Sequence, residues 1–245
     1  MWSLDGVLRY VPLAALYDGR QYLIEQYELS VITLASTAHF KEHPDKEWRA
    51  AGFGVTKGHD DSGPLPAVVS ELAAVKDILH GDIMLDDQFT EASMRDELLK
   101  RYPVVHIASH FRFLPGDESK SFLLLGDGSH LSLKELRTLP NLFGGVQLLT
   151  LSACNTALGD GSEVESFGTL AQRQGAKAVV ASLWQVADES TSRLMQEFYR
   201  IRESAPGMTK LEALREAQLE LLHGAGTLYV HPYYWAPFFL MGNWL

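Results

Sequence analysis

Two residues that could act together as a nucleophile and a base follow apolar, strand-like runs in this sequence. Cys154, the single cysteine of the chain, comes shortly after Val146–Leu151, and His110 directly follows Val104–Ser109. A thiol attacks a carbonyl carbon only when a base takes its proton or a local field lowers its pKa. Neighbouring strands lie about 5 Å apart, so residues that follow two adjacent parallel strands can come within reach of each other. The pair could therefore perform nucleophilic catalysis through a thiolate.

The same two residues also have an ordinary interpretation. A lone cysteine is more often a small buried apolar residue, and a cysteine with a distant histidine is by itself only a candidate site. The polar, turn-prone residues Asn155, Thr156 and Gly159 follow the cysteine. Their backbone N–H groups could hold an oxyanion, which adds to the catalytic interpretation without deciding it.

The elements that must position these residues alternate along the chain. We expect strands at Leu29–Leu34, Gly52–Thr56, Asp82–Leu85, Val104–Ser109, Phe122–Leu125, Val146–Leu151, Ala178–Leu183 and Trp235–Met241, and helices at Ala67–Leu79, Glu91–Lys100, Leu133–Leu139, Val164–Gln174, Glu189–Arg202 and Lys210–Leu222. Near-continuous apolar strands separated by amphipathic helices predict an α/β fold with a mostly parallel sheet and helices on both faces. In such sheets, functional groups gather beyond the carboxyl ends of the strands.

The bulk composition fits a single soluble domain spanning residues 1–245, with 1–60 as a semi-independent subregion, and the abrupt apolar start suggests excision from a longer protein. A net charge of −10 disfavours nucleic acid and anionic membranes as partners. One cysteine permits no intrachain disulfide, and there is neither a signal peptide nor a run long enough to span a membrane. We therefore expect a cytoplasmic protein.

Four blocks of the sequence resemble the CHAT family of caspase-like domains, which often follow tetratricopeptide repeats in bacterial proteins. The blocks are VVHIASHF at Val104–Phe111, LLTLSACNTALGDG at Leu148–Gly161, GAKAVVASLWQVADESTSRLMQEFY at Gly175–Tyr199 and HPYYWAPFFLMG at His231–Gly242. The resemblance implies a caspase-like three-layer sandwich and a cysteine endopeptidase with a His–Cys dyad. It assigns the base to His110 and the nucleophile to Cys154. His106, within the strand, is interpreted as a hydrogen-bonded core residue.

One position departs from the family pattern. The family usually has glycine directly after the base histidine, where the backbone approaches the substrate oxyanion, and this chain has Phe111. Glycine at such a position can serve an unusual φ or a close approach. We expect the main-chain N–H groups of Phe111 and Cys154 to hold the oxyanion, with Phe111 as the feature that could weaken catalysis.

Asp188 is the candidate for substrate selection. The segment Leu183–Asp188 resembles a block of the separases, related peptidases that cut after arginine and hold its side chain with the aspartate of that block. A carboxylate in a pocket would pair with arginine or lysine. The alternative is that Asp188 caps the helix expected to begin near Glu189. Both roles could hold together.

The residues and the resemblance together favour an endopeptidase that cuts a protein after Arg or Lys and needs no cofactor or metal. The resemblance also implies control by a regulatory domain such as tetratricopeptide repeats. The alternative is a catalytically silent domain that binds a partner peptide in the same groove, an interpretation that Phe111 favours and the presence of both His110 and Cys154 disfavours. A nucleotide-binding domain or a serine hydrolase is weaker, because the sequence has neither a glycine-rich phosphate motif after a strand nor a G-x-S-x-G elbow.

Overall fold

The computed structural model of the chain describes residues 1–4, 8, 10–40 (of Ala38 the main chain only), 42, 47–59, 62–114, 116–152, 167–205 and 207–245. A central sheet organises these residues, and its strands stand in the order β1-β10-β9-β8-β4-β2-β3. Their bounds are β1 Ser30–Val31, β2 Ala50–Gly54, β3 Asp82–Leu85, β4 Val104–Ala108, β8 Leu148–Leu151, β9 Ala178–Ser182 and β10 Phe238–Gly242. Every pair is parallel except β10 with β9. The sheet is therefore mostly parallel, as the apolar runs predict.

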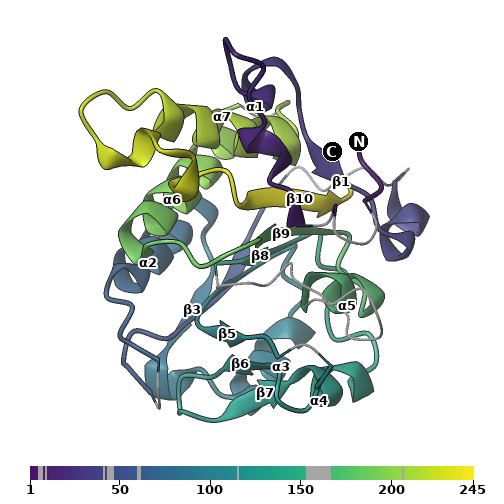
Figure 1. Cartoon of the computed structure of the whole chain (residues 1–245). Coiled ribbons are helices and arrows are strands. Elements are labelled where there is room, and N and C mark those ends of the chain that lie inside the picture. The colour runs from purple at the N-terminus through teal and green to yellow at the C-terminus, as the bar shows by residue number, and fades with distance from the viewer. Residues whose placement is uncertain are drawn as a thin grey trace.

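Helices cover both faces of this sheet (Figure 1). Their bounds are α1 Leu23–Gln26, α2 Ala67–Leu79, α3 Glu91–Leu99, α4 Leu133–Thr138, α5 Phe167–Arg173, α6 Asp188–Ser204 and α7 Lys210–Leu222. One core cluster joins α1, α2, α6 and α7 to the sheet, and the other joins α3, α4 and α5 to its opposite face. Val104 belongs to the first cluster and Val105 to the second, because side chains alternate along a strand. Burial on both faces explains why these strands are apolar throughout.

Two glycines of β2 let α2 approach the sheet closely. A Cβ at Gly54 would lie 2.5 Å from Leu72 Cδ1 of α2, and one at Gly52 would lie 3.1 Å from Leu72 Cδ2. Helix α2 therefore lies closely over β2, and this packing fixes the position of its amino end relative to the strands.

A second, three-stranded antiparallel sheet follows β4 in the chain. It contains β5 (Phe111–Arg112), β6 (Phe122–Leu124) and β7 (His130–Ser132), in that order. The strand expected at Phe122–Leu125 is present, but it forms the centre of this side sheet rather than extending the parallel one. The flanking strands are only two and three residues long, too short to give a periodic pattern.

Most of the expected elements are found, and the differences lie at their ends. The bounds of α2, α7 and β3 match the expectation. Thr90 caps α3 as expected, because its side chain accepts a hydrogen bond from Ser93 N. Strand β1 stops at Val31, since Thr33 caps the 3-10 helix Leu34–His39. Strand β10 begins at Phe238, because Pro232–Tyr234 forms a 3-10 turn just before it.

The first sixty residues contribute to the common core within the described part of the chain. Ala14 and Ile24 are buried in the cluster that contains α6 and α7. Strand β2 lies between β4 and β3 in the central sheet, and β1 pairs with β10. This segment therefore shares both its core and its sheet with the rest of the molecule.

Candidate active site

The two strands that precede the candidate dyad are neighbours. Strands β4 and β8 pair in parallel with Ile107 opposite Leu151, and Ser152 N donates to Ile107 O at 2.9 Å. His110 stands three residues beyond Ile107 in the sequence, and Cys154 stands three residues beyond Leu151. Cys154 and the following Asn155, Thr156 and Gly159 lie outside the described residues. The described part of the site is therefore the side that contains His110.

His110 is oriented by a main-chain carbonyl. Its Nε2 lies 2.7 Å from Gly63 O, on the loop that precedes α2. A carbonyl oxygen can only accept, so Nε2 must be the protonated nitrogen of the pair. In the neutral ring this leaves Nδ1 unprotonated and able to accept a proton. Sequence reasoning missed this partner, because the group that binds the imidazole is a main-chain carbonyl, which any residue at position 63 would supply.

The loop that carries Gly63 is tied to the ends of two strands. Leu65 N donates to Thr56 O at 3.1 Å, just beyond β2. Thr56 in turn donates through its N and its Oγ1 to the carboxylate of Asp86, at 2.8 and 2.7 Å. Burial raises the pKa of Asp86, but these hydrogen bonds outweigh it and leave the pKa below its usual value. An ionised Asp86 therefore anchors the loop that orients the histidine.

Phe111 sends its ring away from the site and into the core. The side chain is 4% exposed and meets the ring of Phe167 edge to face, with 5.5 Å between centroids. Positive φ angles at described non-glycine residues occur only at His80, Asp86, Arg101 and Asn141. The backbone of Phe111 thus has no need of glycine's conformational freedom.

The register of β5 fixes the direction of the Phe111 N–H. Leu124 N donates to His110 O at 2.9 Å, which makes His110 and Leu124 a hydrogen-bonded pair. Phe111 and Leu123, the next pair, are then non-hydrogen-bonded, and their main-chain groups point away from each other. Because β5 is an edge strand of its sheet, the Phe111 N–H faces outward.

Asp188 lies near His110, at the first residue of α6. Ala187 is the N-cap of α6, so Asp188 does not occupy the capping position of its own helix that the alternative interpretation expected. Instead Oδ2 accepts from Ala67 N, the first residue of α2, at 2.6 Å. Burial raises the pKa of this carboxyl, the Ala67 bond lowers it, and the charges of Glu71 and His110 respectively raise and lower it. The net effect is a raised pKa on a half-buried carboxylate within electrostatic range of the imidazole.

His106 occupies a fully buried polar chain beneath this region, which confirms its expected structural role. Its Nε2 lies 2.6 Å from Glu71 Oε1 and its Nδ1 lies 3.0 Å from Tyr199 Oη. Tyr199 Oη donates on to Thr150 Oγ1 at 2.7 Å. This chain connects α2, β4, α6 and β8, and it holds together the four elements that carry Asp188, His110 and the approach to Cys154.

The segment before Asp188 is fixed by the aromatic residues near the end of the chain. Trp184 Nε1 donates to Tyr233 O at 3.1 Å, and Tyr233 Oη donates to Gln185 O at 2.7 Å. The rings of Trp184 and Tyr233 stack with 6.4 Å between centroids. These contacts agree with the packing role expected for both aromatic residues.

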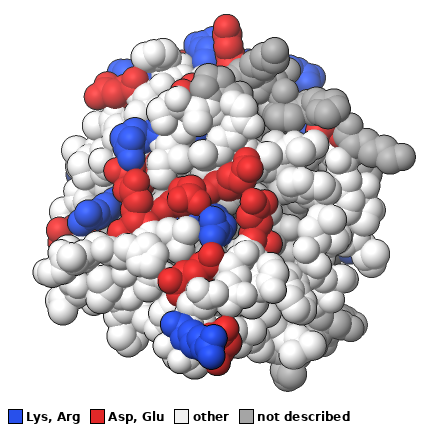
Figure 2. Space-filling view, turned by 90° about the horizontal axis from the view of Figure 1, so that it is seen from above, with Lys and Arg blue, Asp and Glu red and all other residues white. Residues whose placement is uncertain are grey.

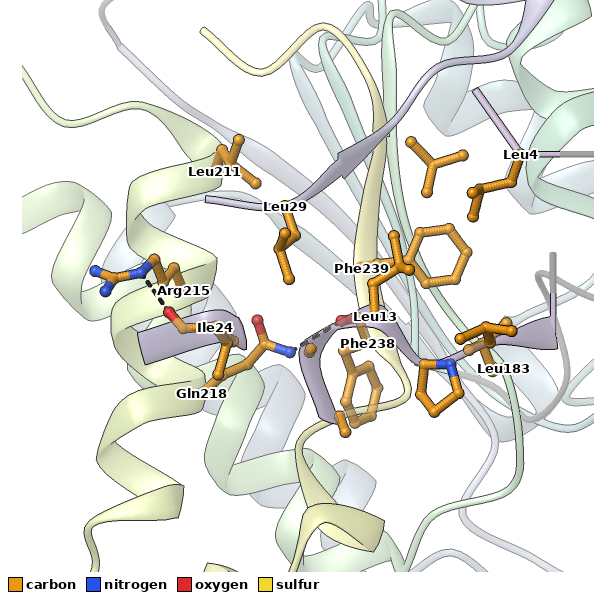
Figure 3. A pocket seen from close by; sticks show the side chains of 15 residues that line it. Leu4, Leu13, Ile24, Leu29, Leu183, Leu211, Arg215, Gln218, Phe238 and Phe239 are labelled. Carbon is orange, nitrogen blue, oxygen red and sulfur yellow. Dashed lines mark hydrogen bonds between the residues drawn. The ribbon is translucent and has the colours of Figure 1, made fainter. Parts of the chain in front are cut away.

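Two other features of the surface do not belong to this site. An apolar cavity of about 40 Å³ lies between the N-terminal segment, β10 and α7, close to Gln218 and Phe238 (Figure 3). Pockets that hold organic ligands span about 300–1,000 Å³, so this one is too small to be a substrate site. The face at the α1 and α7 end gathers acidic side chains (Figure 2). Helix α1 contains Glu25, and α7 contains Glu212, Glu216 and Glu220.

Within the described ranges, no group of three or more His, Cys, Asp or Glu residues is placed to hold a metal ion. None of the described helices is both long enough and apolar enough to cross a membrane.

Solved structures with a similar fold include a cysteine proteinase. The Arg-specific cysteine proteinase gingipain R (RgpB) superposes with a TM-score of 0.58 at 13% identity over 85% of this chain and 50% of its own. The complex of the Porphyromonas gingivalis RgpB pro- and mature domains gives 0.56 at 12% identity, over 85% and 51%. The Saccharomyces cerevisiae separase–securin complex gives 0.66 at 12% identity, over 96% and 15%. The chain thus spans between 15% and 51% of the length of these three solved chains.

The sheet order, the helices on both faces and these likenesses define a caspase-like α/β fold. The chain belongs to the CHAT domain family, whose family model matches residues 1–243. No curated protein sequence matches it significantly.

Proposed function

We propose that this domain is a cysteine endopeptidase in which His110 is the base and Cys154 the nucleophile. The observation that carries the proposal is the hydrogen bond from His110 Nε2 to Gly63 O at 2.7 Å. It fixes the tautomer whose Nδ1 can accept a proton. The parallel pairing of β4 with β8 supports it further, because the two residues follow adjacent strands at the same offset.

The reaction proceeds through an acyl-enzyme. His110 Nδ1 takes the thiol proton, and Cys154 Sγ attacks the scissile carbonyl carbon. The resulting oxyanion accepts hydrogen bonds from the main-chain N–H groups of Phe111 and Cys154. His110 then gives its proton to the leaving amine, and water hydrolyses the thioester. The outward direction of the Phe111 N–H supports its part in this step, and the burial of the Phe111 ring leaves that N–H uncovered by its own side chain.

Asp188 selects a basic residue on the amino side of the scissile bond. Its carboxylate is half-buried, interacts electrostatically with His110 and retains Oδ1 when Oδ2 binds Ala67 N. A carboxylate in such a place pairs with a guanidinium in bidentate or end-on geometry, or with an ammonium as a point charge. The Arg specificity stated for gingipain R, a protein of similar fold, agrees with this assignment.

A positional-scanning peptide library tests the proposal, with wild type beside Cys154→Ala, His110→Ala and Gly63→Ala. We expect cleavage after Arg or Lys that vanishes with Cys154→Ala and falls by about 10²–10⁴-fold with His110→Ala. Gly63→Ala is the matched control: it keeps the carbonyl, and its Cβ would meet nothing within 4 Å. Its rate should stay within a factor of about two.

Cleavage that persists in Cys154→Ala would refute the proposed nucleophile. If wild type cleaves no library peptide, labelling of Cys154 by an arginyl electrophile becomes the deciding measurement. Labelling that depends on His110 would support a competent dyad awaiting activation. No labelling would refute the peptidase and favour a domain that only binds peptides.

A further inference from the structure

The outer face of the side sheet carries a basic groove that the proposed peptidase chemistry does not use. It is an open depression of about 660 Å³ between β5–β7, α4 and the turn at residues 116–120. Arg112, Lys120 and Lys134 line it, together with Phe122, His130 and Glu135. We propose that this groove binds a short acidic segment of a partner protein.

The strand register places the groove's residues on one surface. Arg112 lies opposite Phe122, and Phe122 lies opposite Ser132, so their side chains share a face of the sheet. Phe111, Leu123 and Leu131 occupy the other face and are buried in the core. The sheet is therefore amphipathic, and its polar face is the wall of the groove.

Cationic side chains outnumber carboxylates in the lining of the groove. Lys120 Nζ lies 3.1 Å from Asp117 Oδ2, but 71% of the Lys120 side chain remains exposed. Arg112 and Lys134 are exposed and form no ion pair with any described residue. The one lining carboxylate, Glu135, accepts from Ser132 N and Oγ at 2.9 and 2.6 Å, and these bonds lower its pKa. Glu135 therefore stays ionised, and the lining carries three cationic side chains against this one carboxylate.

This concentration of positive charge is unusual for the chain that carries it. The net charge is −10, and the end of the molecule with α1 and α7 is acidic, whereas the side sheet lies at the opposite end (Figures 1 and 2). A locally basic groove on an acidic protein attracts a short anionic segment through nearby charges. A long polyanion would also meet the repulsion of the whole molecule. Charge therefore favours an acidic peptide over nucleic acid.

A flat aromatic surface adds a second contact. Phe122 and His130 stack with 3.7 Å between ring centroids at an interplanar angle of 15°. The stack forms part of the groove lining between the basic side chains. An apolar or aromatic side chain of the ligand can pack there, while its carboxylates meet Arg112 and Lys134. The expected ligand is an Asp- and Glu-rich stretch containing at least one aromatic residue.

Binding can be measured apart from proteolysis in the Cys154→Ala protein. The probe is a fluorescein-labelled acidic peptide with one tryptophan, compared with its Asn/Gln counterpart and with oligo(dT). We expect saturable binding of the acidic peptide alone, weakened at least about tenfold between 0.05 M and 0.5 M salt because screening shortens the reach of the charges. Equal binding of the neutral peptide, or tighter binding of oligo(dT), would overturn the proposal.

Charge reversal locates the binding site. Arg112→Glu with Lys134→Glu should weaken binding of the acidic peptide at least about tenfold. The matched control, Arg20→Glu with Lys76→Glu, makes the same change of net charge at exposed residues outside the groove and should leave affinity within about twofold. If both double variants lose affinity equally, the effect comes from the net charge of the protein, and a local binding site is refuted.

Lysine footprinting tests the groove in a protein without groove substitutions, so it does not depend on whether the variants fold. Amine acetylation of Lys120 and Lys134 should slow when the acidic peptide is bound. Lys57, 56% exposed, and Lys76 should react at unchanged rates. Protection of all four, or of neither groove lysine, would overturn the assignment. These binding results do not depend on whether the proposed peptidase activity is found.

Discussion

His110 is held by a main-chain carbonyl and Asp188 by a main-chain N–H, so both ends of the candidate site are set by backbone. The side-chain types were visible in the sequence, and so was their place after the strands. The partners Gly63 O and Ala67 N were not, because a backbone group carries no residue signature. Phe111 shows the same principle: the sequence shows a bulky residue where glycine is usual, while only the fold shows its ring buried against Phe167.

Asp188→Asn removes the negative charge of this side chain but keeps its hydrogen bond to the start of α2. The asparagine Oδ1 can still accept from Ala67 N, so the start of α2 keeps its partner. Because burial raises the pKa of Asp188, the wild-type preference for Arg should strengthen as pH rises through that raised value. The variant should lose both the preference and this rise. We would measure kcat/KM for matched arginyl and norleucyl peptides across the acidic range.

Asp188→Asn should also raise the stability of the fold at neutral pH. A carboxyl whose pKa is raised in the folded state contributes stability at low pH that is lost as pH rises through the folded value. Asp188→Asn should therefore unfold at a higher Tm than wild type at neutral pH, and this advantage should shrink on acidification. An advantage that is independent of pH would contradict the assigned titration.

At the scale of elements, the buried chain from Glu71 through His106 and Tyr199 to Thr150 connects two helices and two strands. It lies on the sheet face covered by α2 and α6, beneath Asp188. Its members come from distant parts of the sequence, and only the pairing of β4 with β8 and the packing of α2 on α6 bring them together. This is why the sequence indicated a structural His106 but could not name its partners.

Tyr199→Phe tests what this chain contributes. The substitution keeps the ring but removes the hydroxyl, leaving His106 Nδ1 and Thr150 Oγ1 without their Tyr199 partner in a fully buried place. We expect a loss of about 1–3 kcal/mol in the free energy of unfolding, measured by urea denaturation. Tyr233→Phe is the control, since its hydroxyl bond to Gln185 O is exposed and water can replace it. A Tyr199→Phe loss no larger than that of the control would show that the chain is energetically unimportant.

Prediction of elements from sequence succeeded where burial imposes a long pattern and failed where pairing is local. Helices α2 and α7 have thirteen residues each with a regular apolar face, and their expected bounds are correct. Strands β5 and β7 are brief, and β6 joins them by antiparallel pairing that no periodicity of the chain indicates. The basic groove depends on that pairing, and so it too was invisible in the sequence.

At the scale of the whole molecule, the two large core clusters are separated by a single sheet, and the global stability depends on both. Lys210 is an ionisable residue buried beside the apolar cluster shared by α6 and α7, with 1% of its surface exposed. Its ammonium donates to Leu245 O. Burial, followed by repulsion from Arg202 and Lys177, lowers the pKa of Lys210 to about 7.

This lowered pKa predicts a pH-dependent stability of the entire chain. The pKa of Lys210 is about 7 in the folded state and has its ordinary value of 10.5 in the unfolded state. At a pH between these two values, the unfolded state binds a proton that the folded state does not. Stability conferred by Lys210 should therefore rise as pH increases through that window. Urea midpoints of wild type and Lys210→Met should converge as pH increases from neutral toward 9. Parallel pH profiles for the two would refute the shift, and Lys76→Met, an exposed helix lysine, provides the baseline.

The pairing of β1 with β10 has a consequence for the order of assembly. Ser30 lies opposite Leu240 and Val31 opposite Met241, and the two ends of the chain lie near each other (Figure 1). Strand β10 is also the only neighbour of β9 on that side. During synthesis, β9 therefore leaves the ribosome with an open apolar edge. Strand β1, which Trp2 bridges on one side, lacks its β10 partner for nearly the whole length of the chain. Contacts between such distant segments form slowly. We expect the nascent domain to depend on chaperone protection until Gly242 has emerged, and then to close its sheet in one late step.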